Sequence, residues 1–192
     1  MRTGARAIHL DKRELARLVE HDLVPQILRH ARRHTRPEEP IGATRGWAAG
    51  QLTIDAADGR GTVTVQVSVD SQASPAPFVS VLGGKSNPRS GITLYLNGAL
   101  TPAQLASDER NQPLSACRHE KCLQYGLYSI LLHEATHVAE QALPKTRGPT
   151  YSPGDVEEQG PSPGYINDPQ EIRAFLQQIV DEVTHNARNE DL

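Results

Sequence analysis

The chain has 192 residues, a length that fits one domain with a sizeable core. Hydrophobic residues make up 37% and charged residues 22%, with 15 Gly and 14 Pro, which excludes collagen, a coiled coil and wholesale disorder. No apolar run approaches the ~18 residues that cross a bilayer, and the N-terminal sequence lacks the apolar stretch of a signal peptide. We therefore expect a cytoplasmic protein with no membrane partner, or one exported without such a signal.

The net charge of -3 hides a gradient along the chain. Residues 1–36 contain 9 basic and 4 acidic residues, whereas residues 151–192 contain 2 basic and 9 acidic residues. The basic block could touch phosphates or an acidic partner. No zinc-finger, RRM or basic-zipper pattern accompanies it, so we interpret it as a solvated helix face and not as a nucleic-acid site.

Residues 1–36 predict a basic N-terminal helical segment, which precedes a main domain at 37–192. Asp11 and Glu14 have the spacing of a capping box at the start of a helix. The apolar positions that follow at helical spacing are Leu15, Leu18, Val19 and Leu23. Pro25 is expected to kink or end this helix, because proline lacks the backbone N–H that continues it.

The middle of the chain changes to the alternating pattern of β-strands. Alternation on both sides of the turn signal Asp58-Gly59 predicts a hairpin with one buried face. Further strands are predicted at 78–82 and 92–97, with a Gly-rich turn at 83–91 between them. These segments together predict a sheet of three to four strands.

Three helices are predicted after the sheet: a short one at 102–105, the main one within 114–142, and a last one from Pro169 onward. A stretch rich in Pro and Gly at 144–164 predicts a long loop before the last helix. The apolar stripe of that helix comprises Ile172, Phe175, Leu176, Ile179, Val180 and Val183. Because the stripe keeps helical spacing without a gap, we expect it to pack on the core.

An H-E-x-x-H motif, formed by His133, Glu134 and His137, lies within the main predicted helix. Residues four apart share one helix face, so the two histidines can supply nitrogen ligands to one Zn²⁺, with Glu134 beside the ion. A shuffled sequence of this composition would contain the pattern only about 0.02 times. The motif therefore predicts a zinc site.

A catalytic zinc ion usually has three protein ligands and a water, so the motif needs a third ligand. Glu171 is the leading candidate, 34 residues after His137 at the start of the last helix. Glu171 also suits the third position of a capping box with Asp168 as the N-cap residue, which is its structural alternative. The weaker candidates are Asp155, Glu157, Glu158, Asp168, His119 and His185.

Cys117, His119 and Cys122 form a second group of possible metal ligands. Their spacing matches no strong zinc pattern, and two cysteines are too few for a disulfide framework. We therefore interpret both cysteines as structural or incidental thiols, which fits a reducing compartment.

The HEATH sequence, together with the segment from Tyr165 to Ala174, resembles the zincin metallopeptidases of the gluzincin type, whose third ligand is a glutamate on a later helix. The metzincin extension is absent, since Glu140 and Leu143 stand where Gly and His are needed. The resemblance implies an α+β, zincin-like fold, with a small twisted sheet packed on the active-site helix. It also implies a substrate-binding strand at 92–97.

In the zincins a tyrosine ahead of the glutamate ligand often stabilises the oxyanion, and Tyr165 matches that position. The alternative is that Tyr165 anchors its loop, because tyrosine commonly buries its ring and leaves its hydroxyl in water. Both roles stay open for Tyr165 at this stage.

These features predict a zinc-dependent metallopeptidase that hydrolyses peptide or protein substrates, with Glu134 as the catalytic base. One alternative is a non-catalytic metal-binding or interaction protein with a structural zinc. Another is a delivered effector or toxin protease that uses the same site. Glu134 separates the first alternative from an enzyme, because a structural site needs no base and closes all four coordination positions. No pattern in the sequence specifies the oligomeric state.

Overall fold

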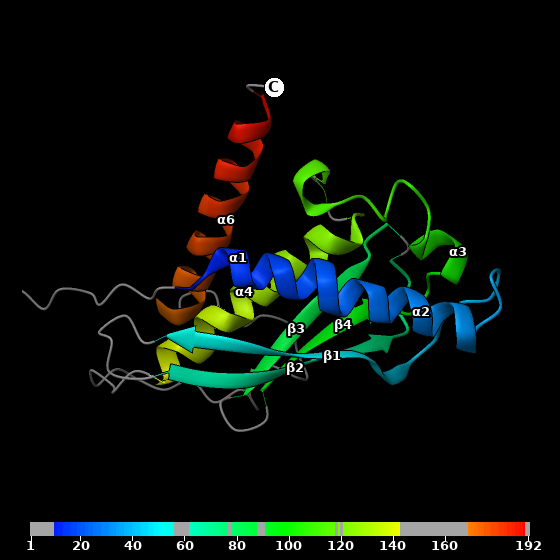
Figure 1. Ribbon diagram of the computed structural model, residues 1–192, viewed down its shortest axis with the longest axis horizontal. Helices are drawn as coiled ribbons and strands as arrows, with labels where there is room; N and C mark the ends of the chain where they lie inside the picture. Colours follow the sequence, from blue (N-terminus) through cyan, green and yellow to red (C-terminus); the bar gives the residue numbers. More distant parts are fainter. Residues whose placement is uncertain are drawn as a thin grey trace, which may run out of the picture.

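A computed structural model of the chain shows an α+β architecture, with helices layered on one face of a four-stranded mixed sheet (Figure 1). The structure describes residues 10–55, 62–76, 78–87, 91–117, 119, 121–142 and 169–190. None of the helices in these ranges is both long enough and apolar enough to span a membrane.

The sheet has the strand order β1-β2-β4-β3. Its strands are β1 Thr44–Asp55, β2 Thr62–Gln72, β3 Val81–Asn87 and β4 Gly91–Asn97. β1 pairs antiparallel with β2, β2 parallel with β4, and β4 antiparallel with β3. Alternate valines of β2 are buried while the threonines between them are exposed, so one face of the sheet carries the core. The predicted hairpin is confirmed, and its turn at Asp58-Gly59 lies outside the described residues.

The third strand differs from the predicted one. A strand was expected at 78–82 with a turn at 83–91, but β3 begins at Val81 and continues through the glycines to Asn87. Gly84 pairs with Leu94 of β4, and Phe78 is exposed ahead of the strand. The alternation of apolar and polar residues does not identify this strand, because its glycines present no side chain to either face of the sheet.

The position of β4 also corrects an expectation. The strand at 92–97 was expected to pair with a substrate, but β4 is hydrogen-bonded to β2 on one side and to β3 on the other. An interior strand has no free backbone edge, so β4 cannot receive another strand. The edge strand beside it is β3.

The N-terminal segment forms a helix in three parts: α1 Lys12–Arg17, the π-helical η1 Leu18–Leu23, and α2 Val24–His34. Pro25 does not end the helix. The turns before Pro25 instead widen into π-helix, a local change in hydrogen bonding that accommodates a residue without an N–H. The apolar face of this three-part helix lies in the same core as the sheet. Its buried side chains are Leu15, Leu18, Val19, Leu23, Val24, Ile27 and Ala31. The arginines of α2 are exposed, which fits both a solvated face and a binding surface.

Asp11 caps α1 as predicted, because its carboxylate accepts hydrogen bonds from the backbone N–H groups of Arg13 and Glu14 at 2.9 and 3.4 Å. Glu14 does not complete a capping box. Its carboxylate accepts a hydrogen bond from the backbone N–H of Thr53 in β1, at 3.4 Å. Glu14 therefore joins the helix to the sheet.

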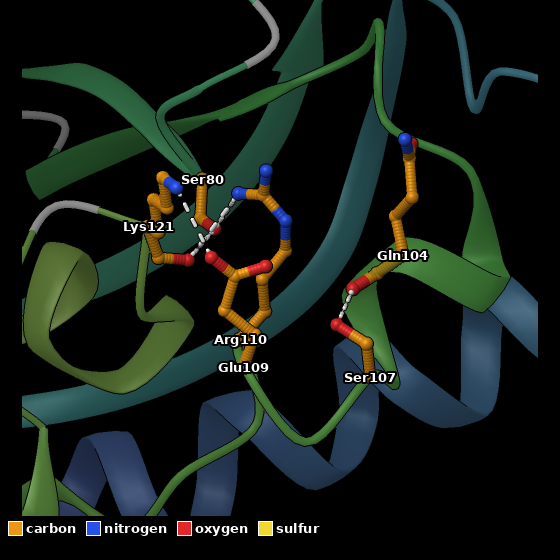
Figure 2. Close-up of polar contacts among 6 residues, drawn as sticks. All are labelled: Ser80, Gln104, Ser107, Glu109, Arg110 and Lys121. Carbon is orange, nitrogen blue, oxygen red and sulfur yellow. Dashed lines mark hydrogen bonds and ion pairs between the residues drawn. The ribbon is translucent and has the colours of Figure 1, made fainter.

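α4 Leu123–Ala142 is the main helix, and it follows the short helices α3 Pro102–Leu105 and η2 Leu114–Ala116. The buried Arg110 side chain donates hydrogen bonds to Ser80 Oγ at 3.0 Å and to the Lys121 carbonyl at 3.3 Å (Figure 2). The Arg110 carbonyl accepts from the Leu123 backbone N–H at 2.8 Å. Because Ser80 precedes β3 and Leu123 begins α4, this network sets the start of the main helix against the edge strand.

Cys117 and Cys122 are joined as a disulfide in the structure, with their α-carbons 6.1 Å apart, which corrects the interpretation of both as thiols. A turn brings the two together, since the Cys122 N–H donates to the His119 carbonyl at 3.0 Å. The bond closes a short loop directly before α4.

α6 Pro169–Glu190 lies beside α4, and its C-terminal turns extend away from the sheet (Figure 1). The expectation that its apolar stripe packs on the core is wrong, because all six stripe side chains are 43–62% exposed. The packed face carries Ala174, Gln178 and Asp181 instead. Gln178 donates a hydrogen bond to Ser129 Oγ of α4 at 2.6 Å, and Asp181 pairs with Lys12 of α1 at 2.5 Å.

Tyr128 of α4 completes the contact between α4 and α6. Burial of the ring, together with the adjacent Asp181 carboxylate, raises the pKa of Tyr128. α6 is therefore held by specific polar contacts, which compete with the hydrophobic pattern and determine which helix face turns inward.

Candidate metal centre

The H-E-x-x-H residues lie in the middle of α4, which is buried on all sides at this point. His133, Glu134 and His137 are only 7–8% exposed, and the leucines that precede them are fully buried. A rigid, packed helix fixes the directions of the side chains that project from it. The two imidazole rings meet edge to face, with centroids 4.8 Å apart.

Glu171 reaches these histidines from the first turn of α6. Its Oε2 lies 3.4 Å from His133 Nε2, and its Oε1 lies 3.3 Å from His137 Nε2. The two Nε2 atoms are 3.1 Å apart. Within the described part of the chain, these three residues form the group of His, Cys, Asp or Glu side chains that could hold a metal ion.

The distances within this group can be compared with those expected in a tetrahedral zinc site and in a hydrogen bond between charged groups. In a tetrahedral zinc site with bonds of about 2.0–2.1 Å, neighbouring ligand atoms lie about 3.3–3.4 Å apart. A charge-assisted hydrogen bond between an imidazolium and a carboxylate is shorter, about 2.7–2.9 Å. The His–Glu separations of 3.3 and 3.4 Å are longer than that hydrogen bond, and they join different oxygens of Glu171, Oε2 to His133 and Oε1 to His137, so the carboxylate faces both imidazoles. The residues therefore fit a single metal ion, and their mix of imidazole nitrogen and carboxylate oxygen suits Zn²⁺.

Glu134 follows His133 on α4, and its side chain lies against the edge strand. A β-carbon on Gly84 of β3 would lie 2.8 Å from Glu134 Cγ and 3.2 Å from Glu134 Oε1. Only glycine leaves room for the Glu134 side chain between α4 and β3. The Glu134 side chain thus packs against the backbone of β3.

Phe175 covers another side of the donor group. Its ring meets the His133 imidazole edge-on, with centroids 4.8 Å apart. An aromatic contact of this kind restricts rotation of the imidazole and shields it from water. Phe175 thereby supports the orientation in which His133 Nε2 faces Glu171.

The structure does not bring every candidate to this group. His119 is exposed and lies outside it. Tyr165 and Asp168, along with the loop carboxylates Asp155, Glu157 and Glu158, fall outside the described residues, as does the loop predicted at 144–164. The side chain of His185 is likewise outside the described part.

The sequence analysis did not identify three residues that shape the site, namely Gly84, Phe175 and Arg110. Gly84 lay within a presumed turn, and Phe175 within a stripe assigned to the core. Arg110 carried no local signal, because an isolated arginine usually lies at the surface. Only contacts between distant segments give these residues their roles.

Comparison of the chain with models of protein families, with curated proteins and with solved structures gives no match. The similarity to zincins therefore rests on the motif in α4 and on the position of Glu171.

Proposed function

We propose that the chain is a zincin-like, zinc-dependent metallopeptidase. The observation that carries this proposal is the convergence of His133, His137 and Glu171 on one point, with Glu134 following His133 on the same buried helix. Zinc bound by these residues would lower the pKa of a water molecule and polarise the carbonyl group of a peptide bond.

Glu134 is the proposed general base. It projects from the same helix as the two histidines and is 8% exposed, so little water surrounds its carboxylate. In this proposal Glu134 accepts a proton from the attacking water and delivers it to the leaving amine. The absence of a side chain at Gly84 leaves the space that the Glu134 side chain occupies against β3. The role of Tyr165 in stabilising the oxyanion stays a prediction.

The edge strand supports a polypeptide as the substrate. β3 pairs with β4 on one side, and its other edge pairs with no strand in the described part of the chain. Extended peptides bind such edges by adding a strand, and backbone hydrogen bonds hold them. Because Gly84 of β3 touches Glu134, a peptide along this edge would pass close to the base.

The test compares Glu134→Gln with the wild type on a peptide library, after zinc reconstitution. We expect one zinc per chain in both proteins and a loss of about 100-fold to 10,000-fold in cleavage by the variant, since only the base is removed. Glu109→Gln is the matched control, because Glu109 is an exposed carboxylate that pairs with Lys121.

Two outcomes would contradict the proposal. A wild type that takes up no zinc would remove its basis. A wild type that binds zinc and cleaves no peptide would instead favour a structural metal in an interaction protein.

A further inference from the structure

The six side chains of the α6 stripe form a continuous apolar surface on the outside of the molecule. Its members are Ile172 (43% exposed), Phe175 (45%), Leu176 (53%), Ile179 (52%), Val180 (56%) and Val183 (62%). The opposite face of α6 is occupied by its contacts with α4 and α1. The helix therefore cannot rotate to bury the stripe without losing those contacts and moving Glu171 away from the histidines.

The size of this surface is comparable to the largest apolar patches on isolated chains, which are often functional. An aromatic side chain covers about 150–250 Å² and the aliphatic side chains of the stripe somewhat less, so six half-exposed ones present up to about 600 Å². That area is at the upper end of the largest apolar patch on a typical monomer, about 300–600 Å². The stripe is thus a candidate for a contact surface.

We propose that the α6 helix of a second copy of this chain covers the stripe, with the two helices antiparallel about a two-fold axis. The spacing of the stripe supports a self-pairing. The positions 172, 176, 179 and 183 alternate by four and three residues, which is the seam of a helix that packs along another helix. No charged residue interrupts the stripe, so a second copy brings no like charge against it.

The stripe is also symmetric about a point between residues 177 and 178. An antiparallel copy therefore places Ile172 against Val183, Phe175 against Val180, and Leu176 against Ile179. Each of the first two pairs joins a larger side chain to a smaller one, which favours close packing. A two-fold contact of this kind is the commonest way in which identical chains associate.

The area is sufficient for a stable contact. Two stripes that cover each other remove up to about 1,200 Å² from water, which reaches the ~1,000 Å² expected of a specific interface. The contact would also reach the candidate metal centre, because Phe175 belongs to the stripe and touches His133. Val180 of the second copy would then line the same side of the site as Phe175.

The first test is the mass of the full chain in solution, measured by analytical ultracentrifugation over a wide range of concentrations. We expect a dimer for the wild type and a monomer for Leu176→Glu, which places a charge at the centre of the seam. Thr184→Glu is the matched control, because Thr184 is an exposed residue of α6 beside the stripe. This control should remain a dimer. Circular dichroism establishes that both variants keep their helices.

The second test fixes the direction of the helices by cysteine cross-linking. Ile172 and Val183 are 11 residues apart, or about 16 Å along the helix. A mixture of Ile172→Cys and Val183→Cys chains should form a covalent dimer on oxidation, while neither variant alone should do so. Cross-linking of each variant with itself would overturn the antiparallel arrangement.

A wild type that stays monomeric at every concentration, or a Leu176→Glu variant that stays dimeric, would overturn the pairing. Neither measurement involves peptide cleavage, so the result is independent of the proposed enzymatic function.

Discussion

Glu134 in α4 packs directly against the backbone of Gly84 in β3, and a β-carbon at that glycine would approach Glu134 Cγ to 2.8 Å. The same β-carbon would lie 2.8 Å from Ile130 Cγ2, and such distances are shorter than real β-carbon contacts, so any side chain at residue 84 must displace both Glu134 and Ile130. This close approach joins the proposed base, together with its neighbour Ile130, to the edge strand.

Gly84→Ala should therefore lower peptide cleavage while zinc binding persists. A displacement of about 1 Å in a catalytic group can cost about 100-fold in rate, and we expect a loss of about 10-fold to 100-fold here. The measurements are kcat on a cleaved peptide and zinc content. Ser86→Ala, on the same strand, is the control and should leave both unchanged. Full activity in Gly84→Ala would show that the position of Glu134 does not matter.

Glu171→Gln tests whether this carboxylate binds the metal or only caps α6. Glutamine can still reach the N-cap amide, so the helix should persist in circular dichroism. If Glu171 is a ligand, the loss of its charge should weaken zinc affinity by more than the 10-fold to 100-fold that is typical of losing an outer partner. Competition with a chromogenic chelator gives the dissociation constant.

Asp168→Asn is the companion to that experiment, because asparagine caps a helix as well as aspartate does. It should leave the zinc affinity unchanged. A loss of affinity in Asp168→Asn with none in Glu171→Gln would assign the third ligand to Asp168.

Removal of the metal should destabilise the fold, because two of the proposed ligands lie in α4 and the third lies in α6. At a free zinc concentration of about 100 times the dissociation constant, binding stabilises the native state by about 2.7 kcal/mol. For a chain of this length the midpoint of thermal unfolding should fall by about 5–10 °C on chelation. Calorimetry with and without chelator measures this shift, and His137→Asn should show almost none of it.

Leu18→Ala should destabilise the protein by about 2–5 kcal/mol, the range for removing a fully buried leucine. Leu18 lies in η1, and a β-carbon on Gly50 of β1 would meet its side chain at 2.5 Å, so the N-terminal helix packs closely on the sheet. Urea unfolding gives the free energy. Leu28→Ala, at a partly buried position of α2, should cost less. Equal, small effects of both substitutions would mean that the N-terminal helices are an accessory surface.

Local patterns were enough to predict much of the fold and the centre of the candidate site. The alternating valines of β2 and the apolar positions around Leu15 reflect side-chain direction, which depends only on neighbouring residues. The same holds for His133 and His137, which must share a helix face wherever α4 packs. These features belong to single elements, so the sequence was sufficient to identify them.

The proximity of Glu171 to the two histidines was proposed on ligand type and spacing, and the fold brings the three residues together. The sequence could not supply the position of Glu134 against Gly84, because that contact joins α4 to a strand about fifty residues earlier in the chain. The edge position of β3 likewise depends on the order of the strands in the sheet.

The orientation of α6 shows most clearly what the tertiary structure decides. The hydrophobic pattern of the helix identifies an apolar face but not what that face meets. In the folded chain Glu171, Gln178 and Asp181 make contacts with α4 and α1, and these polar contacts turn the apolar face outward. Side-chain periodicity is a property of one helix, whereas the choice of its packed face is made by the groups on the helices around it.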